Sequence, residues 1–206
     1  MLDLIIRNGK CYIDGELKEV DVAIKDKKIH QIGQISEEAK ETLDASGHTV
    51  LPGCIDTQTH FREPGSTDTE DLHSGSRAAI AGGITSVFEM PNTNPPTSNK
   101  KEFQRKLDLA KNRMYCNYAF YFGATAENAD DLASLKDLEG CCGIKLFAGS
   151  STGNLLVAEE DDIDKVFQNA SKVVAVHSED EAILKVNKQL IKQGDVHTHP
   201  VWRSAE

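Results

Sequence analysis

The sequence predicts an α/β fold in which repeated strand–helix units build a parallel sheet, preceded by a small antiparallel sheet. Two observations carry this prediction. Up to residue 50, short apolar runs are separated by turn dipeptides, whereas from residue 51 apolar segments alternate with longer stretches of helical composition. Successive apolar segments of the second part are spaced by roughly 30 residues, the length of a βαβ unit. We therefore expect two regions, 1–50 and 51–206.

The first region contains short apolar runs at residues 4–6, 12–13, 20–24 and 29–32. Asn8-Gly9 and Asp14-Gly15 lie between such runs. These dipeptides favour the tight turns that join antiparallel strands, so we expect hairpins here.

The second region alternates five expected strands with five expected helices. The strands are at 50–56, 84–90, 117–122, 143–147 and 173–177, and the helices at 71–81, 100–113, 126–135, 159–170 and 180–192. The last residues, 201–206, resemble the beginning of another segment. Because a complete barrel of eight such units takes about 250 residues, this chain is short for one.

Composition excludes several classes of protein. The chain has 206 residues, with 39% in the apolar set before its 15 glycines are counted, which is typical of a folded domain. A net charge of -10 argues against a nucleic-acid-binding surface. No apolar run suits a membrane span or a signal peptide, and the five cysteines form no CxxC pair. We expect a cytoplasmic protein with reduced cysteines.

The end of the first strand of the second region carries the first candidate site residues. Residues 58 and 60 of an extended segment point to the same side, where a His-x-His pair would hold a metal ion. Here the pair is Gln58 and His60, and an amide oxygen is a poorer zinc ligand than imidazole. Arg62 follows, a forked donor suited to a carboxylate.

The second strand ends in a proline-rich segment around Asn92. Pro91, Pro95 and Pro96 stiffen this segment and could hold the Asn92 amide in one orientation. The same prolines also fit an ordinary structural turn, and this alternative stays open.

Lys145 and His177 end the fourth and fifth strands. A lysine within an apolar run is neutral, paired or chemically changed, and carboxylation would give a carbamate able to bridge two metal ions. A snorkelling lysine and a hydrogen-bonded histidine are the structural alternatives. Because barrel enzymes gather catalytic groups at the carboxyl ends of strands, the positions of His60, Lys145 and His177 favour one shared site.

His197-Thr198-His199 is the one true His-x-His in the chain. It lies in a polar segment before Pro200 and outside any expected strand. We interpret it as a surface loop or a substrate lid rather than a metal site.

Together these segments resemble the N-terminal half of the dihydroorotases, cyclic amidases of the amidohydrolase superfamily. The segments that carry the resemblance are Pro52-Gly53-Cys54-Ile55-Asp56, His60-Phe61-Arg62-Glu63-Pro64-Gly65, Glu89-Met90-Pro91-Asn92-Thr93 with Pro95, Gly143-Ile144-Lys145-Leu146-Phe147 and His177-Ser178-Glu179-Asp180. By this resemblance, region 1–50 is the N-terminal part of a composite β-sandwich. Region 51–206 is then an incomplete metal-dependent barrel, the first five units of a (β/α)8 TIM barrel.

The resemblance also implies a site. His60 and the position of Gln58 would bind one zinc ion, His177 a second, and carboxylated Lys145 would bridge the two. Arg62 and Asn92 would bind the substrate carboxylate, a pair that hydantoinases and allantoinases lack. The family's catalytic aspartate would lie beyond residue 206.

The implied activity is the zinc-dependent, reversible hydrolysis of (S)-dihydroorotate to N-carbamoyl-L-aspartate in pyrimidine biosynthesis. We expect the 206-residue chain alone to be inactive, and the full-length form to be a homo-oligomer that contacts neither nucleic acid nor membrane. One alternative is another cyclic amidase, of the hydantoinase or allantoinase type. A second is a catalytically dead scaffold that binds aspartate transcarbamoylase, which the glutamine at position 58 favours.

Overall fold

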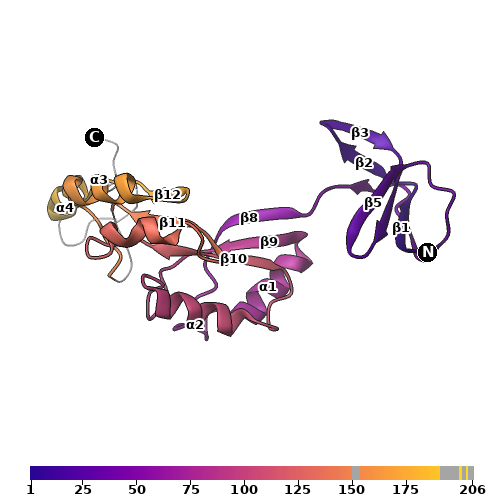
Figure 1. Cartoon of the computed structure of the whole chain (residues 1–206). Helices are drawn as coiled ribbons and strands as arrows, with labels where there is room; N and C mark the ends of the chain where they lie inside the picture. The colour runs from indigo at the N-terminus through magenta and orange to yellow at the C-terminus, as the bar shows by residue number, and fades with distance from the viewer. Residues whose placement is uncertain (150–153, 191–199, 201–202, 204–206) are drawn as a thin grey trace. The chain divides into compact units, whose positions relative to one another are not determined.

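The structure is a computed structural model that describes residues 1–149, 154–190, 200 and 203. The chain forms two compact units, Met1–Gly53 and Cys54–Glu206, drawn in indigo and in magenta to yellow in Figure 1. His197-Thr198-His199 lies outside the described residues. Among the described residues, no helix combines the length and the apolar character that crossing a membrane requires.

The first unit consists of two small sheets. Its strands are β1 (Leu2–Arg7), β2 (Lys10–Ile13), β3 (Glu16–Glu19), β4 (Asp21–Lys25), β5 (Lys28–Gly33), β6 (Ala39–Asp44) and β7 (Thr49–Val50). One sheet has the strand order β5-β4-β1-β6 and the other β3-β2-β7. Leu2, Ile5, Ala23 and Ile35 form the buried core of this unit.

Both sheets are mixed, so the prediction of a purely antiparallel sheet is wrong. β1 pairs in parallel with β6, and β2 pairs in parallel with β7. The Asp14-Gly15 hairpin is confirmed: it joins antiparallel β2 and β3, and both residues have positive φ, as a type I′ turn requires. Asn8-Gly9 instead joins strands of different sheets. Turn dipeptides specify only neighbouring strands, and the parallel partners come from farther along the chain.

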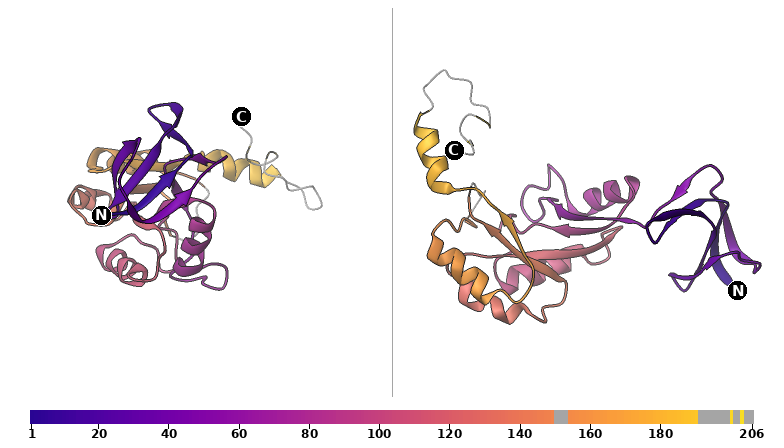
Figure 2. Two further views of the ribbon diagram at one scale, coloured as in Figure 1. Left: turned by 90° about the vertical axis from the view of Figure 1, so that its right-hand side faces the viewer. Right: turned by 90° about the horizontal axis from the view of Figure 1, so that it is seen from above.

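The second unit contains one parallel sheet with the strand order β12-β11-β10-β9-β8. Its elements are β8 (Cys54–Thr59), α1 (Leu72–Ala81), β9 (Ile84–Glu89), α2 (Lys100–Ala110), β10 (Asn117–Gly123), the 3₁₀ helix η1 (Ala129–Leu135), β11 (Cys141–Phe147), α3 (Glu160–Asn169), β12 (Val174–His177) and α4 (Glu181–Leu190). Strands and helices alternate along the chain, and the strands lie in sequence order (Figures 1 and 2). The predicted fold, the first five units of a barrel, is confirmed.

The core of this unit lies between the sheet and its helices. Phe103 of α2 meets Phe120 of β10 edge to face, with ring centroids 6.5 Å apart. Val87, Leu132, Ile144 and Val166 are also buried there. By contrast, Ile55 on edge strand β8 and Val176 on edge strand β12 are exposed. Apolar burial therefore packs the sheet against its helices, whereas the two edge strands also have apolar side chains that are exposed to solvent.

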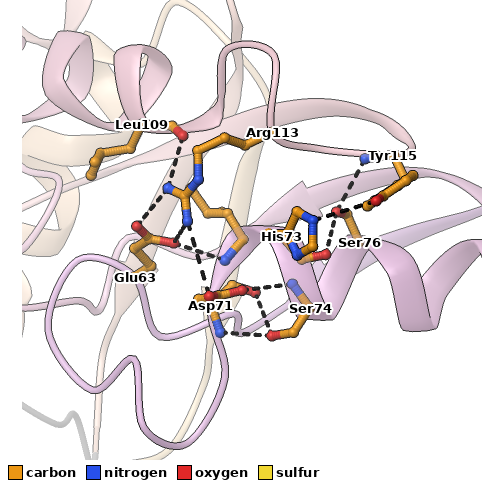
Figure 3. A network of polar contacts seen from close by, with 9 residues as sticks. Glu63, Asp71, His73, Ser74, Ser76, Leu109, Arg113 and Tyr115 are labelled. Atoms are coloured by element: carbon orange, nitrogen blue, oxygen red, sulfur yellow. Dashed lines mark hydrogen bonds and ion pairs between the residues drawn. The ribbon is translucent and has the colours of Figure 1, made fainter.

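A polar network anchors the loop that follows β8 (Figure 3). Glu63 is only 7% exposed, and its two carboxylate oxygens accept hydrogen bonds from the Arg113 guanidinium at 2.7 and 3.2 Å. One of these oxygens also accepts from the backbone N–H of Leu72, the first residue of α1, at 2.9 Å. Arg113 in turn donates to the carbonyl oxygen of Leu109 in α2 at 3.0 Å. The loop is thus tied to the start of α1 and to the end of α2.

Replacing Arg113 by Met should lower the free energy of unfolding of the purified protein by about 1 to 3 kcal/mol, because the buried Glu63 carboxylate loses two charge-assisted hydrogen bonds. Urea denaturation measures the change. Arg105→Met is the matched control, because Arg105 pairs with Glu102 on the exposed face of α2 and should change stability by less than about 0.5 kcal/mol. Equal stabilities of the two variants would contradict the anchoring role.

Candidate active site

All six predicted site residues lie in the second unit, near the carboxyl ends of its strands. His60 and Arg62 follow the end of β8, and Asn92 follows β9. Lys145 lies in β11, and His177 is the last residue of β12. Side chains at this end of a parallel sheet are the ones that barrel enzymes use for binding and catalysis.

His60 is half-buried and surrounded by cations. Burial lowers the pKa of its imidazole, and the charges of Arg62, Lys145 and Lys106 lower it further, against a hydrogen bond with the side chain of Asn92 that acts in the opposite direction. The ring is therefore neutral at pH 7, the form that binds a metal ion. The same interactions show that His60 lies near Arg62, Asn92 and Lys145.

Arg62 and Asn92 line one pocket of about 490 Å³, and Ser66, Thr93, Asn94, Pro96 and Asn154 complete its lining. Arg62 has a φ of 56°, in the left-handed region that a non-glycine residue occupies only when its surroundings hold it there. The two loops that form the pocket contact each other, since the backbone N–H of Asn94 donates to the carbonyl oxygen of Pro64 at 2.9 Å. A forked cation and a primary amide thus face the same space.

Gly65 allows this close approach of the two loops. It has a φ of +125°, and a Cβ atom added to it would lie 3.1 Å from the backbone nitrogen of Asn94. Any other residue at position 65 would therefore push the loops apart and strain the backbone.

Lys145 is 3% exposed, and burial lowers the pKa of its ammonium group. Among the described residues, no carboxylate lies within ion-pair distance of its Nζ atom, which lies instead 4.8 Å from the centroid of the Phe147 ring. A buried ammonium with an aromatic ring in place of an anion is costly to keep charged. The position suits a neutral amine or a carbamate formed from it.

His177 shares a sheet face with Lys145. Phe147 lies opposite His177 in the register of β11 and β12, with ring centroids 6.1 Å apart, and residues 145 and 147 of one strand point to the same side. The Nε2 atom of His177 lies 2.5 Å from a carboxylate oxygen of Glu179, two residues further along the chain. Glu179 thus orients a candidate ligand, a contact that the sequence analysis did not assign.

Gln58 is exposed, and the pairing of β8 with β9 shifts register between Asp56 and Thr59. The strict alternation that places residues 58 and 60 on one side is therefore interrupted at this point. The backbone N–H of Gln58 donates to a carboxylate oxygen of Asp56 at 2.9 Å.

In the described part of the chain, no group of three or more His, Cys, Asp and Glu side chains could hold a metal ion. His60 follows β8 and His177 ends β12, and these two strands form the edges of the sheet, with three strands between them. Lysine contributes a ligand only after carboxylation. A neutral imidazole at position 60 and a buried lysine without an anionic partner nevertheless fit a bridged metal pair chemically.

Sequence reasoning missed a buried ion pair next to the pocket loops. Lys106 of α2 is fully buried and pairs with Glu89, the last residue of β9. Burial raises the pKa of Glu89 to about 7 and lowers that of Lys106, while the charge of each partner acts against the shift of the other. One signal was present: Lys106 shares the buried stripe of α2 with Phe103 and Ala110, at helical spacing.

Proteins of known sequence similar to this chain include cyclic amidases of more than one specificity. A dihydroorotase from Methanosarcina mazei is 35% identical over 95% of the chain, and an allantoinase from Escherichia coli O1:K1 / APEC is 35% identical over 96%. The chain spans 43% and 46% of the lengths of these two relatives.

The structural comparison gives a similar result. An L-hydantoinase (dihydropyrimidinase) from Arthrobacter aurescens superposes with a TM-score of 0.88 and 28% identity, over 98% of this chain and 46% of that one. The family model of the amidohydrolases matches residues 49–202, which include all six predicted site residues. The chain therefore belongs to the amidohydrolase family.

Proposed function

We propose that this chain supplies the substrate-binding half of a dihydroorotase, which hydrolyses the ring amide of (S)-dihydroorotate reversibly to N-carbamoyl-L-aspartate. One observation carries the proposal: Arg62 and Asn92 line the same pocket. A guanidinium fork binds a carboxylate through two charge-assisted hydrogen bonds, and an adjacent amide adds a further donor. The dihydroorotase among the relatives supports the same substrate class.

The carboxylate distinguishes dihydroorotate from other cyclic amides. Hydantoin and allantoin are uncharged rings, and a pocket that places an arginine against them would bury a cation without a partner. Such a mismatch is costly, because a charged group without a partner keeps its full desolvation penalty. The loops of this chain thus favour an anionic ring over a neutral one.

The proposed enzyme uses two zinc ions, which His60, carboxylated Lys145 and His177 would hold together with the position of Gln58. When bound, the metal pair lowers the pKa of a water molecule and polarises the ring carbonyl. Lys145 becomes an anion when its neutral amine adds to carbon dioxide and releases a proton, and the apolar strand favours that neutral amine. His60 needs no deprotonation, because its imidazole is already neutral.

A second candidate is an allantoinase, because the allantoinase relative has the same identity as the dihydroorotase relative. The two proposals differ in the ligand of Arg62: dihydroorotate offers the guanidinium a carboxylate, whereas allantoin is an uncharged ring.

Cytoplasmic location, homo-oligomer formation and contact with aspartate transcarbamoylase stay predictions.

Replacing Arg62 by Met, in the protein that carries these residues with the remaining barrel strands, should lower kcat/KM for dihydroorotate at least about tenfold. The loss of one charge-assisted pair, about 1.5 to 3 kcal/mol, accounts for this size. Steady-state assays of ring opening and ring closure measure it.

Arg77→Met is the control, because Arg77 is exposed on α1, and this variant should keep the parental kinetics. Hydantoin turnover should change less than about twofold in either variant, since an uncharged ring makes no ion pair. Parental kinetics of Arg62→Met with dihydroorotate would refute the substrate assignment, and preferred turnover of allantoin by the parent would favour the second candidate.

Lys145→Ala should lose bound zinc, because the anionic bridge between the metal ions is removed. Elemental analysis after purification in zinc and bicarbonate measures the metal content, and added acetate or propionate should restore part of it by supplying a carboxylate in the vacated space. Lys165→Ala, at an exposed position of α3, is the control. Full zinc content of Lys145→Ala without added acid would overturn the proposed bridge.

A further inference from the structure

The buried pair of Glu89 and Lys106 contacts the loops that form the pocket without lining the pocket itself. Lys106 is 0% and Glu89 1% exposed, and neither lines the pocket. Removing two charges from water is expensive, and an apolar pair of similar volume is often at least as stable. A contribution to stability alone is therefore a weak explanation for this pair.

Each partner of the pair holds the backbone of one pocket loop. The Nζ atom of Lys106 donates to the carbonyl oxygen of Met90 at 2.9 Å, two residues before Asn92. The carboxylate of Glu89 accepts a hydrogen bond from the backbone N–H of Phe61, the residue between His60 and Arg62. One ion pair thus reaches both loops.

Phe61 is held from its other side as well. Its ring is buried against α1 at Gly75, where an added Cβ atom would lie 2.4 Å from the Cδ1 atom of the ring. With its backbone bound to Glu89 and its ring against Gly75, Phe61 is a fixed point in the loop. Arg62, the next residue, holds its left-handed backbone conformation directly beside this point.

We propose that Glu89 and Lys106 are positioning residues that set the separation of Arg62 and Asn92, and so determine how well the pocket accepts a carboxylate. The inference rests on the proposed function for the identity of the ligand. It predicts selectivity between anionic and uncharged rings, which a purely structural pair would not affect.

The test compares Lys106→Met with Leu132→Ala in the protein that carries the complete barrel. Leu132 is fully buried in η1 and does not line the pocket, so its truncation should lower stability without removing either hydrogen bond that Lys106 and Glu89 make to the pocket loops. Lys106→Met should raise KM for dihydroorotate at least about tenfold while KM for hydantoin changes less than about twofold. Leu132→Ala should leave both KM values within about twofold of the parent's values.

Parental KM for dihydroorotate in Lys106→Met, or an equal rise in KM for both substrates, would overturn the inference. If Lys106→Met does not accumulate as folded protein, Glu89→Gln replaces it, since this variant keeps the size of the side chain and one acceptor. Its KM for dihydroorotate should rise at least about threefold, because a neutral acceptor holds Phe61 less strongly. A KM unchanged from the parent's value would again overturn the inference.

A second readout does not depend on the substrate. The backbone amide of Phe61, followed by NMR-detected hydrogen exchange, should exchange at least about tenfold faster in Glu89→Gln than in the parent, relative to the amides of β10. Leu132→Ala should leave this ratio unchanged. A parent that does not turn over dihydroorotate would refute the proposed function alone, whereas an unchanged Phe61 ratio in Glu89→Gln would refute the positioning role alone.

Discussion

The candidate pocket depends on the anchoring of two loops to one helix. Lys106 within α2 and Arg113 just beyond it each bind a buried carboxylate, Glu89 at the end of β9 and Glu63 in the loop after β8. The two pairs are close enough for the charge of Glu63 to act on Lys106. Without these cations, two buried carboxylates would have to be protonated or the loops would have to open.

This anchoring explains how an acidic chain builds a cationic site. The chain carries a net charge of -10, yet His60 is under the influence of Arg62, Lys106 and Lys145. The acidic residues nearby, Glu63 and Glu89, are neutralised by their own partners beneath the loops. Among the described residues that line the pocket, Arg62 is the one charged side chain, so a small anionic ligand meets a local field opposite to that of the whole protein.

The sequence predicts most elements of the second unit because their signals are local. Apolar strands and amphipathic helices repeat at βαβ spacing, and His60, Lys145 and His177 can be placed at strand ends from that pattern alone. The prediction of an antiparallel sheet in the first unit failed because strand pairing there is not local. The parallel partners of β1 and β2 are β6 and β7, which lie far along the chain. The turn between β4 and β5 is a separate, local case: Asp26 and Lys27 form it with positive φ, and it has no glycine to mark it.

The buried cations show a different limit. In the sequence, Lys106 and Arg113 cannot be told apart from the ordinary surface cations of an amphipathic helix. Their function becomes evident only from the carboxylates that the fold places against them. A lysine on the apolar stripe of α2 indicates a buried cation, but it does not identify the carboxylate that pairs with it. Long-range ion pairs are therefore the part of this site that periodicity and motif spacing cannot supply.

Sequence identity alone does not assign a substrate to this chain. A dihydroorotase and an allantoinase match this chain at 35% identity, and a hydantoinase superposes on nearly all of it. What the hydantoinase shares with this chain is the arrangement of strands and helices. In the proposed enzyme, discrimination between an anionic and a neutral ring would depend on whether a cation faces the pocket without a protein carboxylate to neutralise it. In the proposed enzyme Arg62 would meet this condition, because Arg113 and Lys106 pair with Glu63 and Glu89. Selectivity for a carboxylate would then depend on these two ion pairs as well as on the residues that line the pocket.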